Sequence, residues 1–191
     1  MSRALKVVAV SGSLHHPSKT TSLVEAITAQ LESSLDVEVH LIRLDQLGPH
    51  LAGVLRRDRL PAEVEAELVR IETADLLVVA SPVYRASFTG LLKHLFDFVD
   101  QYALVDTPVL LAATGGSERH ALIIDHQFRP LFSFFQALTL PLGVYAHDSD
   151  FLEYRVQSEL LLARIRKVVE RSTAVISSSF AEKEALAHAL R

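Results

Sequence analysis

The sequence of 191 residues contains no cysteine. Disulfides, thiolate nucleophiles, zinc ribbons and iron–sulfur clusters are therefore excluded, and any redox chemistry would need a bound organic cofactor. Long apolar runs are also missing, since none approaches the roughly 18–20 residues that span a bilayer. The short apolar stretch at residues 7–10 is followed by a polar turn without a cleavage signature. We therefore expect a buried strand there rather than a signal peptide, no membrane association, and a cytoplasmic protein.

The chain also lacks a large excess of either charge. Its 19 Lys and Arg residues and 23 Asp and Glu residues give a formal net charge of −4. This balance argues against a nucleic-acid partner and against an electron carrier that docks by charge alone. The nine histidines show no metal-ligand spacing, so we expect no metal site.

Short apolar runs alternate along the chain with segments of helical period. Strands are expected at residues 5–10, 37–44, 76–80, 108–113 and 142–146. Helices are expected at 20–34, from 61 onward, and at 89–101, 120–138 and 152–178, with a loop over 45–61. This pattern predicts an α/β fold of the flavodoxin-like class: a doubly wound, five-stranded parallel sheet of order 2-1-3-4-5 with helices on both faces. We expect one domain over 1–180 and a terminal tail at 181–191 that frays.

Polar turns follow three of the expected strands, at residues 11–13, 81–84 and 114–116. In the expected strand order these turns meet at the carboxyl edge of the sheet, where ligands bind in open α/β folds. The first turn offers hydroxyls and a helix N-terminus to a phosphate, although a plain Ser/Thr-rich helix cap explains it equally well. The second suits the border of a flat ring but by itself fits an ordinary loop better, and the third is open to close approach because glycine lacks a side chain. Their convergence favours flavin mononucleotide (FMN) as the ligand.

In these segments the sequence resembles the NAD(P)H-dependent FMN reductases of the flavodoxin-like superfamily. The resemblance is carried by Gly12-Ser13 with Pro17-Ser18 and Thr20; by Ser81-Pro82-Val83-Tyr84 with Ser87, Gly90, Leu92-Lys93 and Asp97; and by Ala113-Thr114-Gly115-Gly116-Ser117 with His120. It is strongest with the reductase components of two-component alkanesulfonate monooxygenases, especially the methanesulfonate type. The stretch shared with them runs from Thr114 through Asp125 and Pro130 to Gly143 and Asp148-Ser149.

The resemblance implies a flavin reductase that uses NADH or NADPH and passes reduced FMN to a partner monooxygenase. It implies phosphate contacts from Ser11, Ser13, Ser18, Lys19 and Thr20. It implies contacts to the isoalloxazine ring from Pro82, Val83, Tyr84, Arg85, Thr114, Gly115 and Gly116. No side chain is expected to be catalytic, because the hydride passes directly from nicotinamide to flavin. His15 stands where relatives often carry arginine, so the phosphate charge falls to Lys19 and the helix N-terminus.

Three other functions remain open at this point. A quinone, azo or chromate reductase of the same fold would keep FMN as a prosthetic group and would be yellow when purified. A flavodoxin-type carrier or a non-catalytic phosphate-binding module would turn over NAD(P)H poorly or not at all. The nucleotide preference is also open, because Arg85 or Arg119 could meet a 2′-phosphate or simply be solvated.

The expected helix at 120–138 is apolar on more than one face, which requires burial on more than one side. Pro130 lies inside it and cannot donate a hydrogen bond to the preceding turn, so the helix must kink or widen into a π-type turn. The resemblance implies an inserted residue at the position of His126 and assembly of a homotetramer through this helix. We therefore predict a π-bulge containing His126 at a subunit interface near the flavin, where it helps to make FMN a transient substrate.

Overall fold

The computed structural model describes residues 3–189, and its centre is one parallel sheet. The main strands are β1 (Leu5–Ser11), β2 (Val37–Arg43), β3 (Leu76–Pro82) and β4 (Pro108–Gly115). Two short strands, β5 (Leu138–Thr139) and β6 (Val144–His147), both pair with β4. The strand order is β2-β1-β3-β4-β5, so the predicted flavodoxin-like topology is confirmed. The expected fifth strand at 142–146 corresponds to β6, whereas β5 is an additional short strand that starts at the end of the expected helix 120–138.

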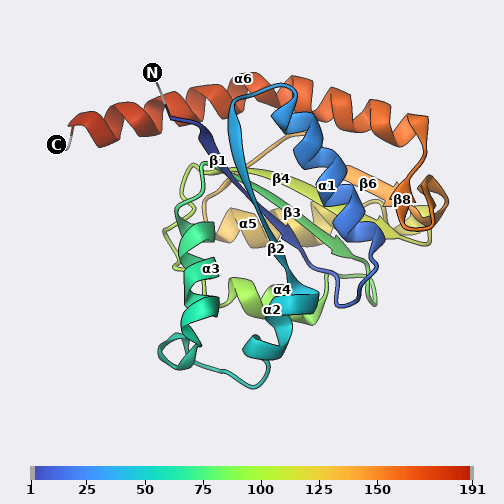
Figure 1. The fold of residues 1–191 in the computed structure, drawn as a ribbon, viewed down its shortest axis with the longest axis horizontal. Coiled ribbons are helices and arrows are strands. Elements are labelled where there is room, and N and C mark those ends of the chain that lie inside the picture. Colours follow the sequence, from blue (N-terminus) through green and yellow to red (C-terminus); the bar gives the residue numbers. More distant parts are fainter. Residues whose placement is uncertain (1–2, 190–191) are drawn as a thin grey trace.

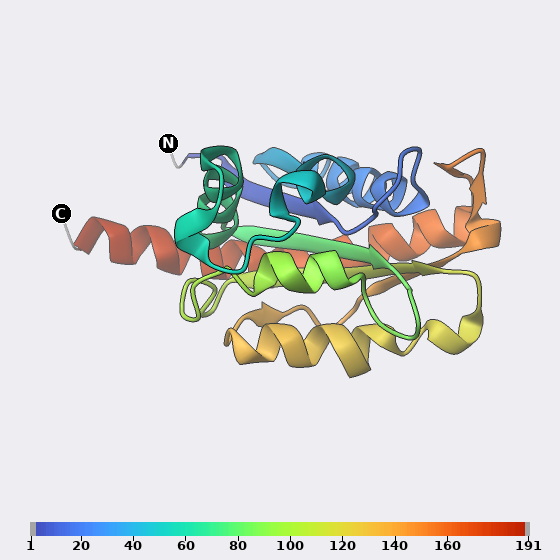
Figure 2. The ribbon, with the colours of Figure 1, turned by 90° about the horizontal axis from the view of Figure 1, so that it is seen from below.

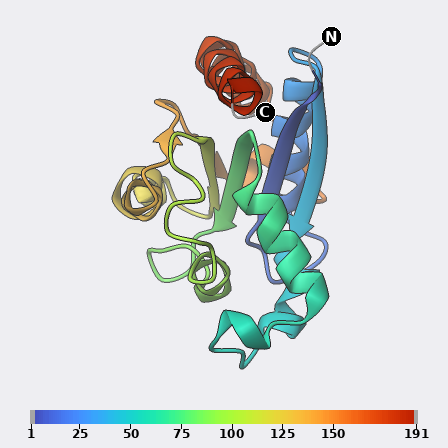
Figure 3. The same cartoon turned by 90° about the vertical axis from the view of Figure 1, so that its left-hand side faces the viewer.

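Helices cover both faces of the sheet, as the continuous apolar strands require. On one face, α1 (Lys19–Glu32) and α6 (Glu159–Ala189) enclose one apolar cluster (Figures 1 and 3). A second cluster lies under α2 (Leu44–Leu51), α3 (Ala62–Glu72), α4 (Gly90–Phe96) and α5 (Arg129–Phe134). Helices α4 and α5 lie side by side (Figure 2), and the rings of Phe96 and Phe132 meet edge to face with centroids 5.0 Å apart. The strands are thus buried between two apolar layers, and their ends are left for binding.

Several element boundaries differ from the sequence-based expectation. Helix α2 occupies part of the expected loop at 45–61, and α4 ends at Phe96 rather than at residue 101. The helix expected from residue 152 begins only at Glu159, because residues 151–156 form an antiparallel hairpin of β7 (Phe151–Leu152) and β8 (Arg155–Val156). Ser158 stabilises the actual start of α6, since its hydroxyl accepts a hydrogen bond of 3.2 Å from the amide of Leu161.

The segment expected as one helix over 120–138 is divided into three parts. A 3-10 turn spans Glu118–His120, a π-helix spans Ile124–Phe128, and α5 follows directly and ends at Phe134. In the π-helix the amide of Arg129 donates to the carbonyl of Ile124, five residues earlier. The predicted π-turn containing His126 is therefore present. The helix stops earlier than expected because Gln136 has a left-handed φ of 55°.

The last part of α6 continues past the expected domain boundary at residue 180, as far as Ala189. It extends toward the N-terminal end of the chain (Figure 1), where Glu184 pairs with Arg3 at 3.1 Å. Residues 181–189 are therefore helical rather than frayed. Within residues 3–189, no helix is both long enough and apolar enough to cross a membrane.

Candidate functional site

A pocket of about 330 Å³ lies at the carboxyl edge of β1, β3 and β4, where the three polar turns converge. It is lined by Ser13, His15, Pro17, Ser18, Lys19, Thr20, Pro82, Val83, Tyr84, Thr114, Gly115, Gly116, Asp148 and Tyr154. A larger cavity of about 550 Å³ lies at the opposite edge of the sheet, beside Pro108 at the start of β4. We assign the site to the smaller pocket, because a helix N-terminus and glycine-containing turns meet there.

The first loop brings hydroxyl groups and the start of α1 to one end of the pocket. Ser18 caps α1, since its Oγ accepts a 3.2 Å hydrogen bond from the amide of Thr21. Amides in the first turn of a helix have no partner within the helix and carry its positive dipole end. The hydroxyl of Ser13 comes from the loop and that of Thr20 from the first turn of α1, and both residues line the pocket. This end of the pocket suits a phosphate group.

The loop after β1 is held by one hydrogen bond to the backbone of β3 and by another from the side chain that caps α4. The amide of Gly12 donates to the carbonyl of Ala80 at 2.7 Å, and the Thr89 hydroxyl donates to the carbonyl of Gly12 at 2.9 Å. A Cβ at residue 12 would lie 3.0 Å from the Ala80 oxygen and 3.1 Å from the Ser81 side chain. Glycine is therefore needed at this position for the two loops to approach each other.

The second and third loops form the other end of the pocket. The amide of Val83 donates to the carbonyl of Thr114 at 2.8 Å, and the hydroxyls of Thr20 and Thr114 lie 2.6 Å apart. Tyr84 opens the tight turn 84–87, which is closed by two backbone hydrogen bonds between Tyr84 and Ser87. Tyr84 is 42% exposed and lines the pocket. Backbone atoms and one aromatic ring thus border the space that a planar ligand would occupy.

Tyr145 supports the third loop from behind. Its hydroxyl donates a 2.6 Å hydrogen bond to the carbonyl of Ser117, and a Cβ at Gly115 would lie only 2.5 Å from this hydroxyl. Burial raises the pKa of Tyr145, and nearby Glu118 and Asp148 raise it further against the effect of the Ser117 hydrogen bond. The phenol therefore remains a neutral donor that fixes the loop at neutral pH.

Two charged side chains face each other across the phosphate end. Lys19 Nζ lies 2.8 Å from Asp148 Oδ1, with side-chain exposures of 33% and 54%. Asp148 directly follows β6. Its other carboxylate oxygen lies close to Gly116, where a Cβ would be 3.0 Å from Oδ2. The loop after β6 therefore contributes a fourth wall to the pocket.

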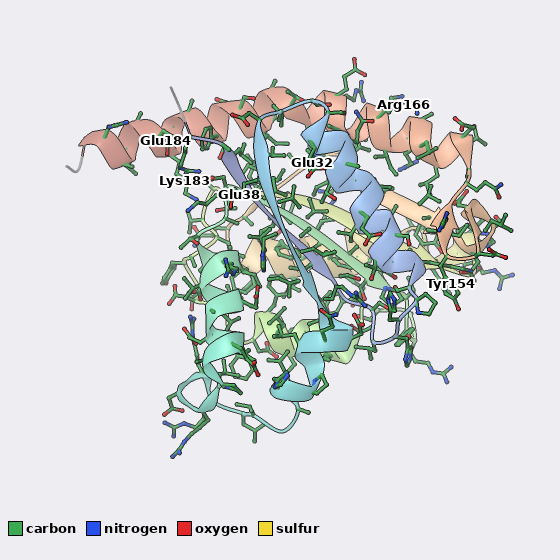
Figure 4. The ribbon with its side chains drawn as sticks, in the orientation of Figure 1. Glu32, Glu38, Tyr154, Arg166, Lys183 and Glu184 are labelled. Atoms are coloured by element: carbon green, nitrogen blue, oxygen red, sulfur yellow. The ribbon has the colours of Figure 1, made fainter. Side chains whose placement is uncertain are left out.

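The structure brings together all the residues predicted to contact FMN except Ser11 and Arg85. The Ser11 side chain is buried, and its hydroxyl lies 2.8 Å from that of Thr21, behind the pocket wall. Arg85 has a left-handed φ of 51° in the turn after Tyr84 and does not line the pocket. The predicted list did not include Asp148 and Tyr154. Asp148 follows an expected strand, so its position in the sequence could have indicated that it lies at this edge of the sheet. Tyr154 belongs to a hairpin at a position where a helix was expected, so its position in the sequence did not indicate this (Figure 4).

The pocket residues fit FMN in their chemistry. The lining combines hydroxyls, a helix N-terminus and one lysine with the backbone of Gly115 and Gly116 and the ring of Tyr84. A phosphate and a flat ring need this combination of polar and backbone-lined surface. Within the part of the chain that the structure describes, no group of three or more histidine, aspartate or glutamate residues could hold a metal ion.

The chain is similar to a known protein family and to several curated proteins. Residues 5–151 match the family model described as NADPH-dependent FMN reductase. The chain is 62% identical over 172 residues to an NADH-dependent FMN reductase, SfnF, of Pseudomonas fluorescens, covering 90% of this chain and 92% of that protein. It is 58% identical over 172 residues to an FMN reductase (NADPH) of Pseudomonas aeruginosa, with the same coverage.

Solved structures agree with this placement. The apo form of the NADH:FMN oxidoreductase EmoB is similar with a TM-score of 0.80 and 28% identity, over 92% of this chain and 90% of that one. A flavodoxin, WrbA-like protein of Agrobacterium tumefaciens is similar with a TM-score of 0.63 and 16% identity, over 92% and 99% of the two chains. The second likeness concerns the fold alone.

Proposed function

This chain belongs to the NADPH-dependent FMN reductase family, and we propose that it supplies reduced FMN to a partner monooxygenase. It is an NAD(P)H:FMN oxidoreductase, with FMN and NADH or NADPH as its reactants. We propose that the partner uses the reduced flavin to desulfonate alkanesulfonates such as methanesulfonate, and that both proteins work in the cytoplasm. The sulfonate assignment rests on the resemblance over residues 114–149.

One observation supports the proposal: four segments at the carboxyl edge of the sheet form a pocket whose hydroxyls and helix N-terminus suit a phosphate and whose backbone and tyrosine surface suits a flat ring. Tyr84, which lines the pocket, is 42% exposed, so this surface is open to a second planar molecule. A reductase that exchanges its flavin needs such an entrance, because reduced FMN must leave after each turnover.

The side chains act here by binding and orienting rather than by acid or base chemistry. Bound FMN would supply the ring that accepts a hydride from the nicotinamide. The hydroxyls of Ser13, Ser18 and Thr20 and the amides at the start of α1 would hold the phosphate. The backbone at Pro82–Tyr84 and Thr114–Gly116 would fix the plane of the ring, so that the two reactants meet in one orientation and water is kept from between them.

The surface of the π-helix region supports assembly through this segment. Phe128 and Phe132 are buried in the core, whereas Leu122 and Phe134, which flank the π-helix and end α5, are each 60% exposed. Such large apolar side chains on one segment suit contact with a second copy of the chain. We propose a homotetramer that buries this face, with His126 at the interface.

We also propose that residues 1–180 form one reductase domain to which the rest of α6 is attached. The main competing function is a quinone, azo or chromate reductase that keeps FMN as a prosthetic group. The two proposals differ in how firmly FMN is held, because a prosthetic flavin stays with the protein through turnover.

Purification and steady-state kinetics distinguish these functions. We expect a colourless protein whose oxidation of NADH or NADPH requires added FMN, and whose reduced FMN supports desulfonation when the monooxygenase is present. The control is a reaction in which a dialysis membrane separates the two proteins, since free diffusion of the flavin then still permits slow transfer. A yellow protein that retains FMN through gel filtration and reduces quinones without free flavin would contradict the proposal.

A further inference from the structure

The pocket contains one pair of opposite charges at its phosphate end. In the described part of the chain, Lys19 is the one lysine or arginine that lines the pocket, and Asp148 is the one carboxylate. These two side chains are joined by the 2.8 Å contact between Nζ and Oδ1. The side chains at the phosphate end therefore provide no net positive charge for a phosphate dianion.

The position of Asp148 is fixed by its own loop. Asp148 begins a 3-10 turn that His147 and Asp150 close with reciprocal hydrogen bonds, including one of 2.8 Å from the His147 amide to Asp150 Oδ2. Gly116 allows the carboxylate to lie against the third loop, because a Cβ there would lie 3.0 Å from Oδ2. The carboxylate is thus about half exposed and lies between Lys19 at the start of α1 and Gly116 in the loop after β4.

We infer that Asp148 lowers the affinity for FMN by competing with its 5′-phosphate for Lys19. An incoming phosphate must either draw Lys19 away from the carboxylate or lie beside a like charge, and both cost binding free energy. The Lys19–Asp148 pair is half exposed, and pairs of this kind are individually weak, so the phosphate can still displace it. This inference rests on the proposed exchange of FMN, because a competitor of this kind makes the flavin easier to release.

The predicted loss of affinity concerns only the phosphate group of the ligand and not its ring. Riboflavin has the same isoalloxazine ring and ribityl chain as FMN but no phosphate, so the competition should not affect its binding. An Asp148 that instead held a ribityl hydroxyl would influence both ligands to the same extent. Comparison of the two ligands therefore separates the competing role from a direct contact.

The test measures dissociation constants of oxidised FMN and riboflavin by quenching of flavin fluorescence, with no turnover involved. We expect Asp148→Asn to bind FMN about tenfold more tightly than the parent protein, because one opposing charge near a partly exposed site is removed. The affinity for riboflavin should be unchanged. Asp148→Ser also removes the carboxylate, with a different replacement side chain. It should likewise tighten FMN binding and leave riboflavin binding unchanged.

Glu153→Gln is the matched control, since it removes one negative charge from the adjacent hairpin at a residue that does not line the pocket. It should leave both dissociation constants unchanged. Equal effects of Asp148→Asn on FMN and riboflavin, or no effect on either, would overturn the inference. Failure of the proposed function would instead appear in the parent protein, as FMN that stays bound through turnover.

Discussion

The Thr20 hydroxyl belongs both to the pocket and to the fold. It lies 2.6 Å from the Thr114 hydroxyl, so it joins the loop after β1 to the end of β4. One of the two hydroxyls must donate to the other, and the remaining hydrogen and lone pairs are left for a ligand. A residue with this geometry positions the third loop while it presents a polar atom to the phosphate end.

The double substitution Ser13→Ala with Thr20→Ala should weaken FMN binding. Each hydroxyl lost from a charged phosphate costs about 1.5–3 kcal/mol, so the loss of two should raise the dissociation constant by at least about a hundredfold. Isothermal titration with FMN measures this change. Thr28→Ala is the control, because Thr28 is a buried threonine of the same helix whose hydroxyl donates to the carbonyl of Glu25. An unchanged FMN affinity in the double variant would show that these hydroxyls do not hold the phosphate.

At this scale the sequence predicts which residues follow strands but not how each side chain is directed. The position of the first polar turn after a buried strand places it at the carboxyl edge of the sheet, and the resemblance to FMN reductases implied Ser13, Ser18 and Thr20 as its phosphate contacts. The resemblance implied Ser11 as well, yet Ser11 is the last residue of β1 and bonds to Thr21 in the interior. The pairing of Lys19 with Asp148 joins residues 129 positions apart, and no local pattern indicates it.

Among the elements, the π-helix is the one irregular feature that the sequence indicated. Pro130 has no amide hydrogen to donate to the preceding turn. In the structure this part of the chain is a π-helix, in which the Arg129 amide donates to the Ile124 carbonyl. Helix α2 could not be predicted in this way, because it contains Gly48 and Pro49, which usually favour a loop. Its formation depends on tertiary packing, since a Cβ at Gly48 would lie 2.5 Å from the Leu91 side chain.

Deletion of His126 should convert the π-helix to a regular α-helix, because it removes the one extra residue from the wide turn. The side chains around Leu122 then point in a different direction relative to those of α5. We expect loss of the tetramer in analytical ultracentrifugation and a yellow protein that retains FMN. His126→Ala is the matched control, because it removes the imidazole but keeps the chain length, and it should behave as the parent does. A deletion variant that remains tetrameric, colourless and active would reject this role.

For the molecule as a whole, the site and the contact between Arg3 and α6 lie at opposite edges of the same sheet. The pocket lies at the carboxyl ends of the strands, whereas Arg3 at the start of the chain and the last turns of α6 meet at the amino ends (Figure 4). The fold class was predictable because a parallel sheet follows from apolar strands that alternate with helices. The length of α6 could not be predicted from the sequence, because its last turns are held by charged contacts with segments that are distant in the sequence.

Asp75 joins these distant segments. Its side chain is fully enclosed, its carboxylate accepts hydrogen bonds from Arg3 Nη2 at 3.0 Å and from the Lys6 amide at 2.8 Å, and Lys183 of α6 lies 3.5 Å away. Burial alone would raise the pKa of Asp75, but the hydrogen bonds and the charges of Lys183 and Arg3 outweigh it and hold the pKa below its usual value. The ionised carboxylate is therefore the form that the folded state favours.

Stability should accordingly depend on pH through Asp75. A carboxyl whose pKa is lowered by folding stabilises the protein at pH above its unfolded value, about 3.9, and that stabilisation is lost as the pH falls through the folded value. We expect Asp75→Asn to lower the free energy of unfolding by about 1.5–3 kcal/mol at pH 7, since charged hydrogen bonds are lost. Below pH 4 the difference from the parent should shrink. Urea unfolding curves at pH 7, 5, 4 and 3 measure both effects.

The control for this prediction is Asp97→Asn, which removes a half-exposed carboxylate paired with Lys93 on the surface of α4. Exposed pairs contribute little to stability, so this variant should follow the parent at every pH. A constant difference between Asp75→Asn and the parent from pH 7 to pH 3 would mean that the side chain acts by shape alone. A difference that closes on acidification would show that the ionised carboxylate holds the last turns of α6 and the first strand to the edge of the sheet.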